Sequence, residues 1–543
     1  MSPRAFDLDR RALRHACAIA FGVLALAVRF VGIGSQPLWF DEAMTLHIAH
    51  QPGGLGLAHN TPPLYYLLLD AWTRGFGVDA TGLRSFSAVC GAAFVWASFH
   101  AARAMFGSRA AIAAATFALV APLHLYYSQE ARAYSLLLAL LMVAQWAAWL
   151  VRERVRVGAV AALCGVSIAA LYTHFLAAIP LACIFATAAW SAWRAGRRDC
   201  LRSIAAAGAV AVASLLPWLW WWKRHTPFQA SDMQWLAMLW RESSGIGLLS
   251  ASAELLVLGG QHGSPLFLKQ FSAMAFPPAL RVAGLVAFVV LLGVAVARLR
   301  ASDSPMRRAF AQCVLSSVAP LAVLFAASFV HPTYAPGRYD LVAFPALTLL
   351  VGGSCAVVFA SSQRWAHVVW IGAASVFAVS AVAKDRDYLA APAAVDPFDR
   401  VAAHLTEHVQ AEDLVVLCGN TGVPVLAHLA QRGFQWHERR CRTANGRGFV
   451  CRLLPPTLEE APATASRYLQ ALEQGSMPAS LAAMVQDAAA PSIWLVFGEE
   501  LRTGGRDPAM DSVGRQLVAV LHHGGFTEDL GEPALGLVHF RRH

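Results

Sequence analysis

The sequence predicts a mainly α-helical, polytopic membrane protein that ends in an external α/β domain. The chain of 543 residues is 57% hydrophobic and only 14% charged, with a mean hydropathy of +0.50. This composition is too apolar for an ordinary soluble protein. Apolar runs of spanning length recur up to about residue 384, and the composition then becomes polar. We therefore assign residues 1–384 to a transmembrane domain and 385–543 to an external domain.

About eleven runs are long enough to cross a bilayer, which takes roughly 17 to 25 residues. The residues before the first run lack a small-residue cleavage site, so we expect an uncleaved first helix. Two connections are long. We expect 35–81 to be an external loop and 223–277 to be an external loop that skims the membrane. The runs begin near residues 14, 83, 110, 133, 157, 175, 203, 277, 309, 341 and 365.

The net charge of +10 belongs to the membrane domain. Residues 385–543 hold 14 basic and 19 acidic side chains, against 29 basic and 14 acidic before them. This distribution argues against a nucleic-acid partner. The positive-inside rule places the arginine-rich ends and the N-terminus in the cytoplasm, and the C-terminal domain outside. The arginines gather at 4–14, 103–109, 152–156, 194–202, 298–308 and 364.

The acidic pair Asp41 and Glu42 lies just beyond the first apolar run. Adjacent acids at the point where a helix leaves the bilayer are costly unless water or a cation compensates, so such pairs mark sites. Each carboxylate also raises the pKa of the other, so we expect an arginine nearby. The alternative is that Asp41 only caps a helix that begins after Phe40. The candidate partners are Arg29, Arg132 and Arg338.

An amphipathic helix is predicted after Pro62 and Pro63, because proline suits the first turn of a helix. Its residues Tyr65 and Tyr66 are typical of aromatic side chains at headgroup depth.

Three other external turns carry polar residues. Glu130 and Arg132 lie between two spans, which by itself is typical of an interfacial ion pair. His174 ends a span, where a histidine is more often a satisfied polar group than a ligand. Arg338 follows a proline and a glycine at the start of a span, where a lipid phosphate would lie.

The external domain has short apolar runs at 414–418 and 493–497, which predict buried strands, and helical patterns at 400–409 and 513–522. We expect 439–462, which is rich in Arg, Pro and Glu, to be a loop. Three cysteines lie in this domain. A disulfide between Cys441 and Cys451 is left open, because Cys418 would then be the odd thiol.

Four motifs together resemble bacterial glycosyltransferase family 39, which consists of integral-membrane enzymes of the GT-C type. The family is related to the protein O-mannosyltransferases and to the aminoarabinose transferase of lipid A. The resemblance covers about residues 14–385, and the external domain carries no motif that we can assign. The motifs are Trp39–Ala43, Thr61–Leu69, Tyr127–Tyr134, and Arg338–Tyr339 followed by Pro345.

The resemblance implies an inverting transfer of a sugar from a polyprenyl-phosphate donor. The acceptor would be a glycan, a lipid or a protein on the outer face of a bacterial inner membrane. Asp41 matches the family's catalytic acid, with Glu42 as its neighbour. The family often has His-Pro-Pro-Leu where this chain has Thr61. A role for that histidine is therefore in doubt, and whether His59 replaces it is open.

The chemistry of the residues agrees with this resemblance. A hydroxyl that attacks an anomeric carbon needs a base, which Asp41 can supply. The departing phosphate needs a cation or a metal, and the candidates that would bind it are Arg338, Arg132 and Tyr339. Glu130 would hold Arg132, and Glu42 would orient Asp41 or bind the acceptor. A divalent metal is left open, because no residue spacing requires one.

Two other classes of protein stay open. A transporter or flippase of lipid-linked sugars would also be polytopic, but it should place charges in the middle of its spans. If the protein were an assembly scaffold, the external domain would carry its function. The acids here gather at the external ends of the spans, which favours the enzyme.

The predicted topology can be tested with single cysteines and a membrane-impermeant reagent in intact cells. We expect labelling of a cysteine introduced into the external domain and none beside Arg154. The opposite pattern would reverse the orientation.

Overall fold

The computed structural model describes residues 3–50, 62–225, 234–242, 245–259, 277–299, 304–390, 398–418, 422–437, 440–443, 448–454, 490–496, 519, 521–523, 525–529 and 537–542. They form two compact units. The first consists of Met1–Gln36 and Ile48–Ala394, and the second of Pro37–His47 and Val395–His543. A short piece of the first predicted loop therefore groups with the C-terminal domain.

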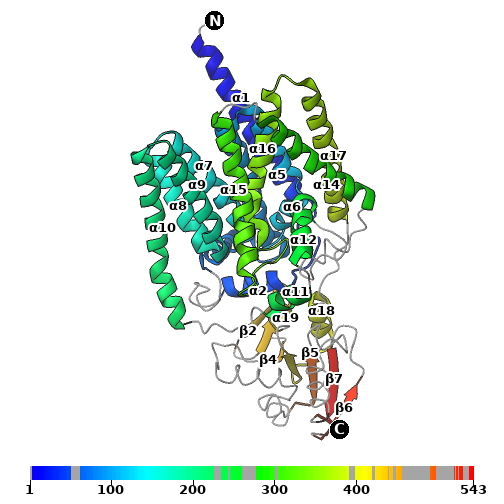
Figure 1. Ribbon diagram of the computed structural model, residues 1–543. Coiled ribbons are helices and arrows are strands. Elements are labelled where there is room, and N and C mark those ends of the chain that lie inside the picture. The colour runs from blue at the N-terminus through cyan, green and yellow to red at the C-terminus, as the bar shows by residue number, and fades with distance from the viewer. Residues whose placement is uncertain are drawn as a thin grey trace. The chain divides into compact units, whose positions relative to one another are not determined.

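The first unit is a bundle of helices (Figure 1). Among the described residues, eight helices are long and apolar enough to cross a membrane, and the number is nine if α5 and α6, which meet at a bend of 63°, count as one span. The predicted polytopic bundle is confirmed. The helices are α1 (Pro3–Phe30), α3 (Leu64–Phe76), α4 (Ala80–Phe106), α5 (Ser108–Val120), α6 (Pro122–Ser128), α7 (Tyr134–Glu153), α8 (Val157–Thr173), η1 (Phe175–Ala177), α9 (Ala178–Arg194), α10 (Arg198–His225), α11 (Gln234–Glu242), α12 (Gly245–Leu258), α14 (Pro278–Leu299), α15 (Ser304–Ala327), η4 (Asp340–Ala343), α16 (Phe344–Ala360) and α17 (Arg364–Ala390).

Small residues bring the central helix α16 close to its neighbours. A Cβ atom on Gly352 would lie 2.8 Å from the carbonyl oxygen of Ala110 in α5, and one on Gly353 would lie 2.9 Å from the ring of Phe106 in α4. Close packing of small residues is a usual way for helices to associate in membranes. With α16 at the centre, α8, α9 and α10 lie on one side of it and α14 and α17 on the other (Figure 1).

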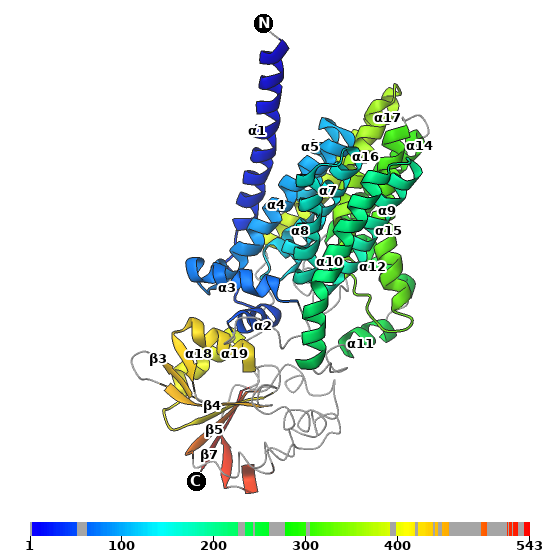
Figure 2. The same ribbon diagram turned by 90° about the vertical axis from the view of Figure 1, so that its left-hand side faces the viewer.

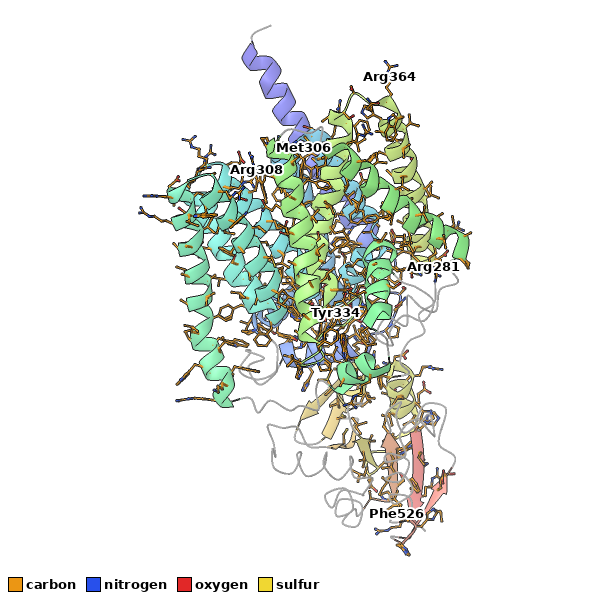
Figure 3. The ribbon with its side chains drawn as sticks, in the orientation of Figure 1. Arg281, Met306, Arg308, Tyr334, Arg364 and Phe526 are labelled. Carbon is orange, nitrogen blue, oxygen red and sulfur yellow. The ribbon has the colours of Figure 1, made fainter. Side chains whose placement is uncertain are left out.

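Arg308 and Arg364 agree with the charge pattern of the sequence, whereas Arg281 lies nearer the other end of the bundle (Figure 3). Arg308 and Arg364 lie at one end of the bundle and Tyr334 lies towards the other end (Figure 3). The N-terminal part of α1 extends beyond its neighbouring helices (Figure 2). Which end faces the cytoplasm stays a prediction.

Both long connections contain helices. In the first, α3 begins at Leu64 directly after Pro63, as predicted, and Arg74 forms an ion pair with Asp70. In the second, α10 continues to His225, and α11 and α12 follow. Residues 234–258 of this connection are thus largely helical, and that 223–277 is an external loop that skims the membrane stays a prediction. The apolar residues of α12 pack into the bundle core through Leu255.

A buried network around Arg29 joins α1, α5 and α6. Arg29 is 0% exposed. Its Nε donates to Ser128 Oγ at 3.1 Å and its Nη2 lies 2.8 Å from His124 Nδ1. Nη1 and Nη2 also donate to the backbone oxygens of Ala25 and Ala118. These bonds engage all three nitrogens of the guanidinium group. That Arg29 partners the acidic pair stays a prediction.

The second unit contains a sheet whose described strands have the order β2-β3-β4-β1-β5-β7-β6. The central strand β1 is parallel to β4 and β5, and the outer pairs are antiparallel. The helices α18 and α19 share one hydrophobic core with β1, and they lie side by side (Figure 2). The bounds are β1 (Leu414–Cys418), β2 (Phe434–His437), β3 (Arg440–Thr443), β4 (Gly448–Leu454), β5 (Ser492–Val496), β6 (Phe526–Asp529), β7 (Leu537–Arg542), α18 (Phe398–His408) and α19 (Gly422–Gln431).

The strands predicted at 414–418 and 493–497 and the helix at 400–409 are confirmed. The loop expected over 439–462 is wrong in its first half, because β3 and β4 lie there. Pairing of β4 with the buried strand β1 overrides a local composition that is poor in β-branched residues. Cys441 and Cys451 are buried and not bridged. The helix expected at 513–522 lies largely outside the described residues.

The Arg29 network should make Gly91 irreplaceable. A Cβ atom there would lie 2.2 Å from Ser128 Oγ and 2.9 Å from Arg29 Nε. We expect Gly91→Ala to destabilise the protein by about 1 to 3 kcal/mol through overpacking. Gly293, within α14, has nothing within 4 Å of its Cβ position, so Gly293→Ala should be neutral or slightly stabilising. Thermal unfolding in detergent compares the two variants, and equal midpoints would contradict this account.

Candidate functional site

Two of the sequence motifs are joined directly in the first unit by tyrosine hydroxyls. The Tyr127 hydroxyl donates to the carbonyl oxygen of Gly337 at 2.6 Å. Arg338 Nε donates to the Tyr134 hydroxyl at 2.8 Å. These bonds connect residues 210 and 204 positions apart. They fix Arg338 against the turn between α6 and α7, which contains Arg132.

Arg132 and Arg338 both act on His174. Burial, together with the positive charges of Arg132 and Arg338, lowers the pKa of His174 to about 3. The ring is therefore neutral, and its Nδ1 accepts the backbone N–H of Leu176 at 3.1 Å. The interpretation of His174 as a satisfied polar group is confirmed. Because both arginines lower this pKa, their positive charges both act on the surroundings of His174.

Aromatic rings support this arginine pair. The His174 ring lies 5.7 Å from the Tyr134 ring and 6.2 Å from the Tyr339 ring. Tyr127 packs edge-on against Tyr134 at 4.8 Å. Tyr339, which follows Arg338, is thus placed beside His174 by the same short loop. This loop turns at Gly337, whose φ of 73° is costly for a residue with a side chain.

Glu130 lies in the same cluster. It is 5% exposed, and its charge acts on the Tyr127 hydroxyl together with those of Arg338 and Asp340. The backbone N–H of Arg132 donates to the carbonyl oxygen of Glu130 at 2.7 Å, which makes a tight turn. That the Glu130 carboxylate holds the Arg132 side chain stays a prediction.

A third motif reaches the cluster through Tyr65. The Tyr65 hydroxyl lies 3.5 Å from Ser87 Oγ, which lies 3.5 Å from the carbonyl oxygen of Arg132. Tyr65 and Tyr66 are 1% and 4% exposed. Protein therefore covers both rings, and their depth in the membrane stays a prediction. Tyr65 packs on Phe86 of α4, 5.7 Å between ring centres, because its side of α3 faces the bundle.

The acidic pair begins the helix α2 (Phe40–Ala49), and its residues up to His47 belong to the second unit. The carbonyl oxygen of Trp39 accepts the N–H groups of Glu42 at 3.1 Å and Ala43 at 3.0 Å, so Trp39 is the N-cap residue. Glu42 Oε2 accepts the N–H of Trp39 at 3.4 Å, which is the return half of a capping box.

Glu42 thus makes the capping hydrogen bond at the start of α2. This argues against the alternative that Asp41 serves only as the helix cap. Asp41 occupies the second helical position. The unpaired N–H groups and the dipole at a helix N-terminus favour a negative charge there. Thr45 Oγ1 donates to the carbonyl oxygen of Asp41 at 2.8 Å, which fixes the backbone at this residue. That the Asp41 carboxylate serves the arginine pair stays a prediction.

The remaining candidates fall elsewhere. His59 lies outside the described residues. Among the described residues, no group of three or more His, Cys, Asp or Glu side chains could hold a metal ion. Sequence reasoning quoted Tyr127 and Tyr134 only as members of a motif and missed that their hydroxyls hold the fourth motif. Their spacing of seven residues, on either side of a charged turn, was the available signal.

Residues 60–221 match the family model described as dolichyl-phosphate-mannose-protein mannosyltransferase. No curated protein sequence matches the chain. The structure is similar to the crystal structure of ArnT from Cupriavidus metallidurans in the apo state. That similarity has a TM-score of 0.59 at 14% identity and covers 97% of this chain and 98% of the other.

The same ArnT bound to undecaprenyl phosphate gives a TM-score of 0.58 at 14% identity, with 97% and 98% of the two chains covered. The oligosaccharyltransferase of Archaeoglobus fulgidus in the apo form gives 0.50 at 10% identity, with 94% and 73% covered. The resemblance read from the motifs is confirmed: the chain has the GT-C fold of these membrane glycosyltransferases, and its residues 60–221 match the mannosyltransferase family.

Proposed function

We propose that this protein is an integral-membrane glycosyltransferase that moves a sugar from a polyprenyl-phosphate donor to an acceptor. The observation that carries the proposal is the convergence of Arg132 and Arg338 on the neutral His174. A guanidinium group is suited to phosphate, because it offers several donors in a planar fork. The ArnT relative whose structure contains undecaprenyl phosphate supports a lipid phosphate as the group bound here.

The reaction needs little beyond charge and a base. An acceptor hydroxyl attacks the anomeric carbon, the new C–O bond forms as the bond to the phosphate oxygen breaks, and the configuration inverts. Arg132 and Arg338 compensate the negative charge that stays on the departing lipid phosphate. Asp41 takes the proton of the attacking hydroxyl. No general acid is required, because a phosphate leaves well without protonation.

The elements around these groups set their geometry. Arg338 is oriented by Tyr134 through its Nε, and the backbone of its loop is held by Tyr127. Glu42 starts the helix on which Asp41 lies, which makes Glu42 an orienting residue rather than a second base. Tyr339 lies next to Arg338 and is a further candidate ligand for the phosphate.

The setting of the reaction is also part of the proposal. We place it at the outer face of a bacterial inner membrane, with the C-terminal domain in the periplasm. The acceptor is a glycan, a lipid or a protein. Arg308 and Arg364, at the end of the bundle away from Tyr334 (Figure 3), support this orientation through the positive-inside rule.

Removing the Arg338 charge should impair transfer strongly. We expect Arg338→Ala to lower kcat/KM by about 100- to 1000-fold, equivalent to about 3 to 4 kcal/mol, as for the loss of one preorganised donor. Arg338→Lys should recover only part, because a point charge replaces a fork. The measurement is transfer of label from polyprenyl-phosphate sugars into membrane acceptors. Arg364→Ala, at the other end of the bundle, is the matched control, and near-normal transfer by Arg338→Ala would remove Arg338 from the site.

Asp41→Asn tests the base. Asparagine keeps the shape of aspartate but cannot take the proton, so transfer should fall by about 100-fold or more. Binding of the donor should persist, because other residues hold the phosphate. Donor binding and transfer are measured on the same purified protein. A variant that transfers normally would show that Asp41 is not the base.

A further inference from the structure

We propose that the C-terminal domain positions Asp41, the proposed catalytic base, and that His428 of α19 is the positioning residue. This inference rests on the proposed function, since it assumes that Asp41 acts in transfer. It assigns a role to a domain for which the sequence offered no motif. Every contact that supports it lies within the second unit, which contains both Pro37–His47 and the C-terminal domain.

One peptide group before α2 is held from two sides. Leu38 and Trp39 share this peptide bond. Its carbonyl oxygen, on Leu38, lies 2.9 Å from His428 Nε2, and its N–H, on Trp39, donates to Glu42 Oε2. A peptide group is planar, so these two bonds together set the plane from which the helix begins. Asp41 is the second residue of that helix.

The bond from His428 is well defined. Leu38 is 0% and His428 1% exposed, so no water competes for the carbonyl oxygen. Burial lowers the pKa of His428, and the ring is neutral at pH 7. A carbonyl oxygen can only accept, so the single ring proton is on Nε2. Nδ1 lies 3.2 Å from Gln431 Oε1, one turn further along α19. Because Nδ1 then has no proton, it pairs with Gln431 when this amide is turned so that its nitrogen donates.

Apolar packing anchors the same segment. Phe40 packs against the hydrophobic core that α18 and α19 form with β1. This core includes Phe398, Val425 and Leu429. Phe40 is the first residue of α2 and directly precedes Asp41. The helix start is therefore attached to the C-terminal domain by one ring in its core and one hydrogen bond from its second helix.

Without the His428 donor, the buried carbonyl oxygen of Leu38 has lost its hydrogen bond. This loss costs enough free energy for the Leu38–Trp39 peptide group to rotate away from its present orientation. Asp41 would then lose its alignment, while the arginine pair, built entirely from the first unit, would be unchanged. Small displacements of a catalytic group can cost about 100-fold in rate. We therefore expect kcat to fall about 10- to 100-fold with KM for the donor unchanged.

The test uses the full-length protein and three substitutions of His428. In His428→Leu the donor is absent, and in His428→Asn an amide is present but too short to reach Leu38. In His428→Gln an amide nitrogen can take the place of Nε2. We expect low kcat in the first two and substantial rescue in the third. His428→Asn and His428→Gln are both polar, so their comparison stays informative even where His428→Leu does not fold.

His539→Leu is the matched control. His539 is a buried histidine of the same domain, stacked on Trp494 at 3.9 Å and paired with Asp529, and both of these partners lie outside residues 37–47. It should lower the unfolding midpoint of the domain without changing kcat at temperatures where the protein stays folded. A fall in kcat as large as that of His428→Asn would mean that general weakening of the domain, not positioning, is the cause.

Asp41→Asn, assayed in parallel, separates the two proposals. Normal transfer by Asp41→Asn would overturn the proposed base, and the positioning role with it. Defective transfer by Asp41→Asn, combined with normal kcat in folded His428→Asn, would overturn the positioning role and leave the proposed base in place.

Discussion

The arginine site depends on two hydrogen bonds made by tyrosine hydroxyls. Tyr127 holds the carbonyl oxygen of Gly337, and Tyr134 accepts Arg338 Nε. These bonds hold the loop before η4 against the turn between α6 and α7 and against the start of α7. Two positive charges placed close together repel each other, so bringing both arginines into one cluster costs free energy. Neutral His174 lies beside the rings of Tyr134 and Tyr339, and the buried Tyr127 ring packs on Tyr134.

The proposed chemistry is divided between the two units. The groups suited to a lipid phosphate belong entirely to the membrane bundle, where they come from α6, α7 and the loop before η4. The acid belongs to a segment that is integrated into the C-terminal domain by Phe40 and Leu38. With this division, the groups that would bind the donor phosphate and the base that would activate the acceptor are positioned by separate sets of packing contacts. It also explains why an α/β domain without a catalytic motif would be retained beside a membrane enzyme.

Three sequence-based expectations lacked the same information, because local sequence does not reveal the partner of a side chain. Arg29 looked available at the end of a span, but its three nitrogens are used inside the bundle. Tyr65 looked like an interfacial residue, yet α4 covers it. The segment 439–462 looked like a loop, because β3 and β4 become strands only by pairing with each other and with β1.

By itself the sequence determined the membrane bundle, the change of composition near residue 384 and the motifs that identify the fold. These follow from hydropathy, charge asymmetry and short residue patterns, all of which are local properties. Tertiary structure alone decided that the charges of Arg132 and Arg338 both act on His174, that Glu42 caps α2, and that His428 holds Leu38 from 390 positions away. Such contacts join distant residues, and no local pattern encodes which distant groups the packing of helices will bring within hydrogen-bonding distance.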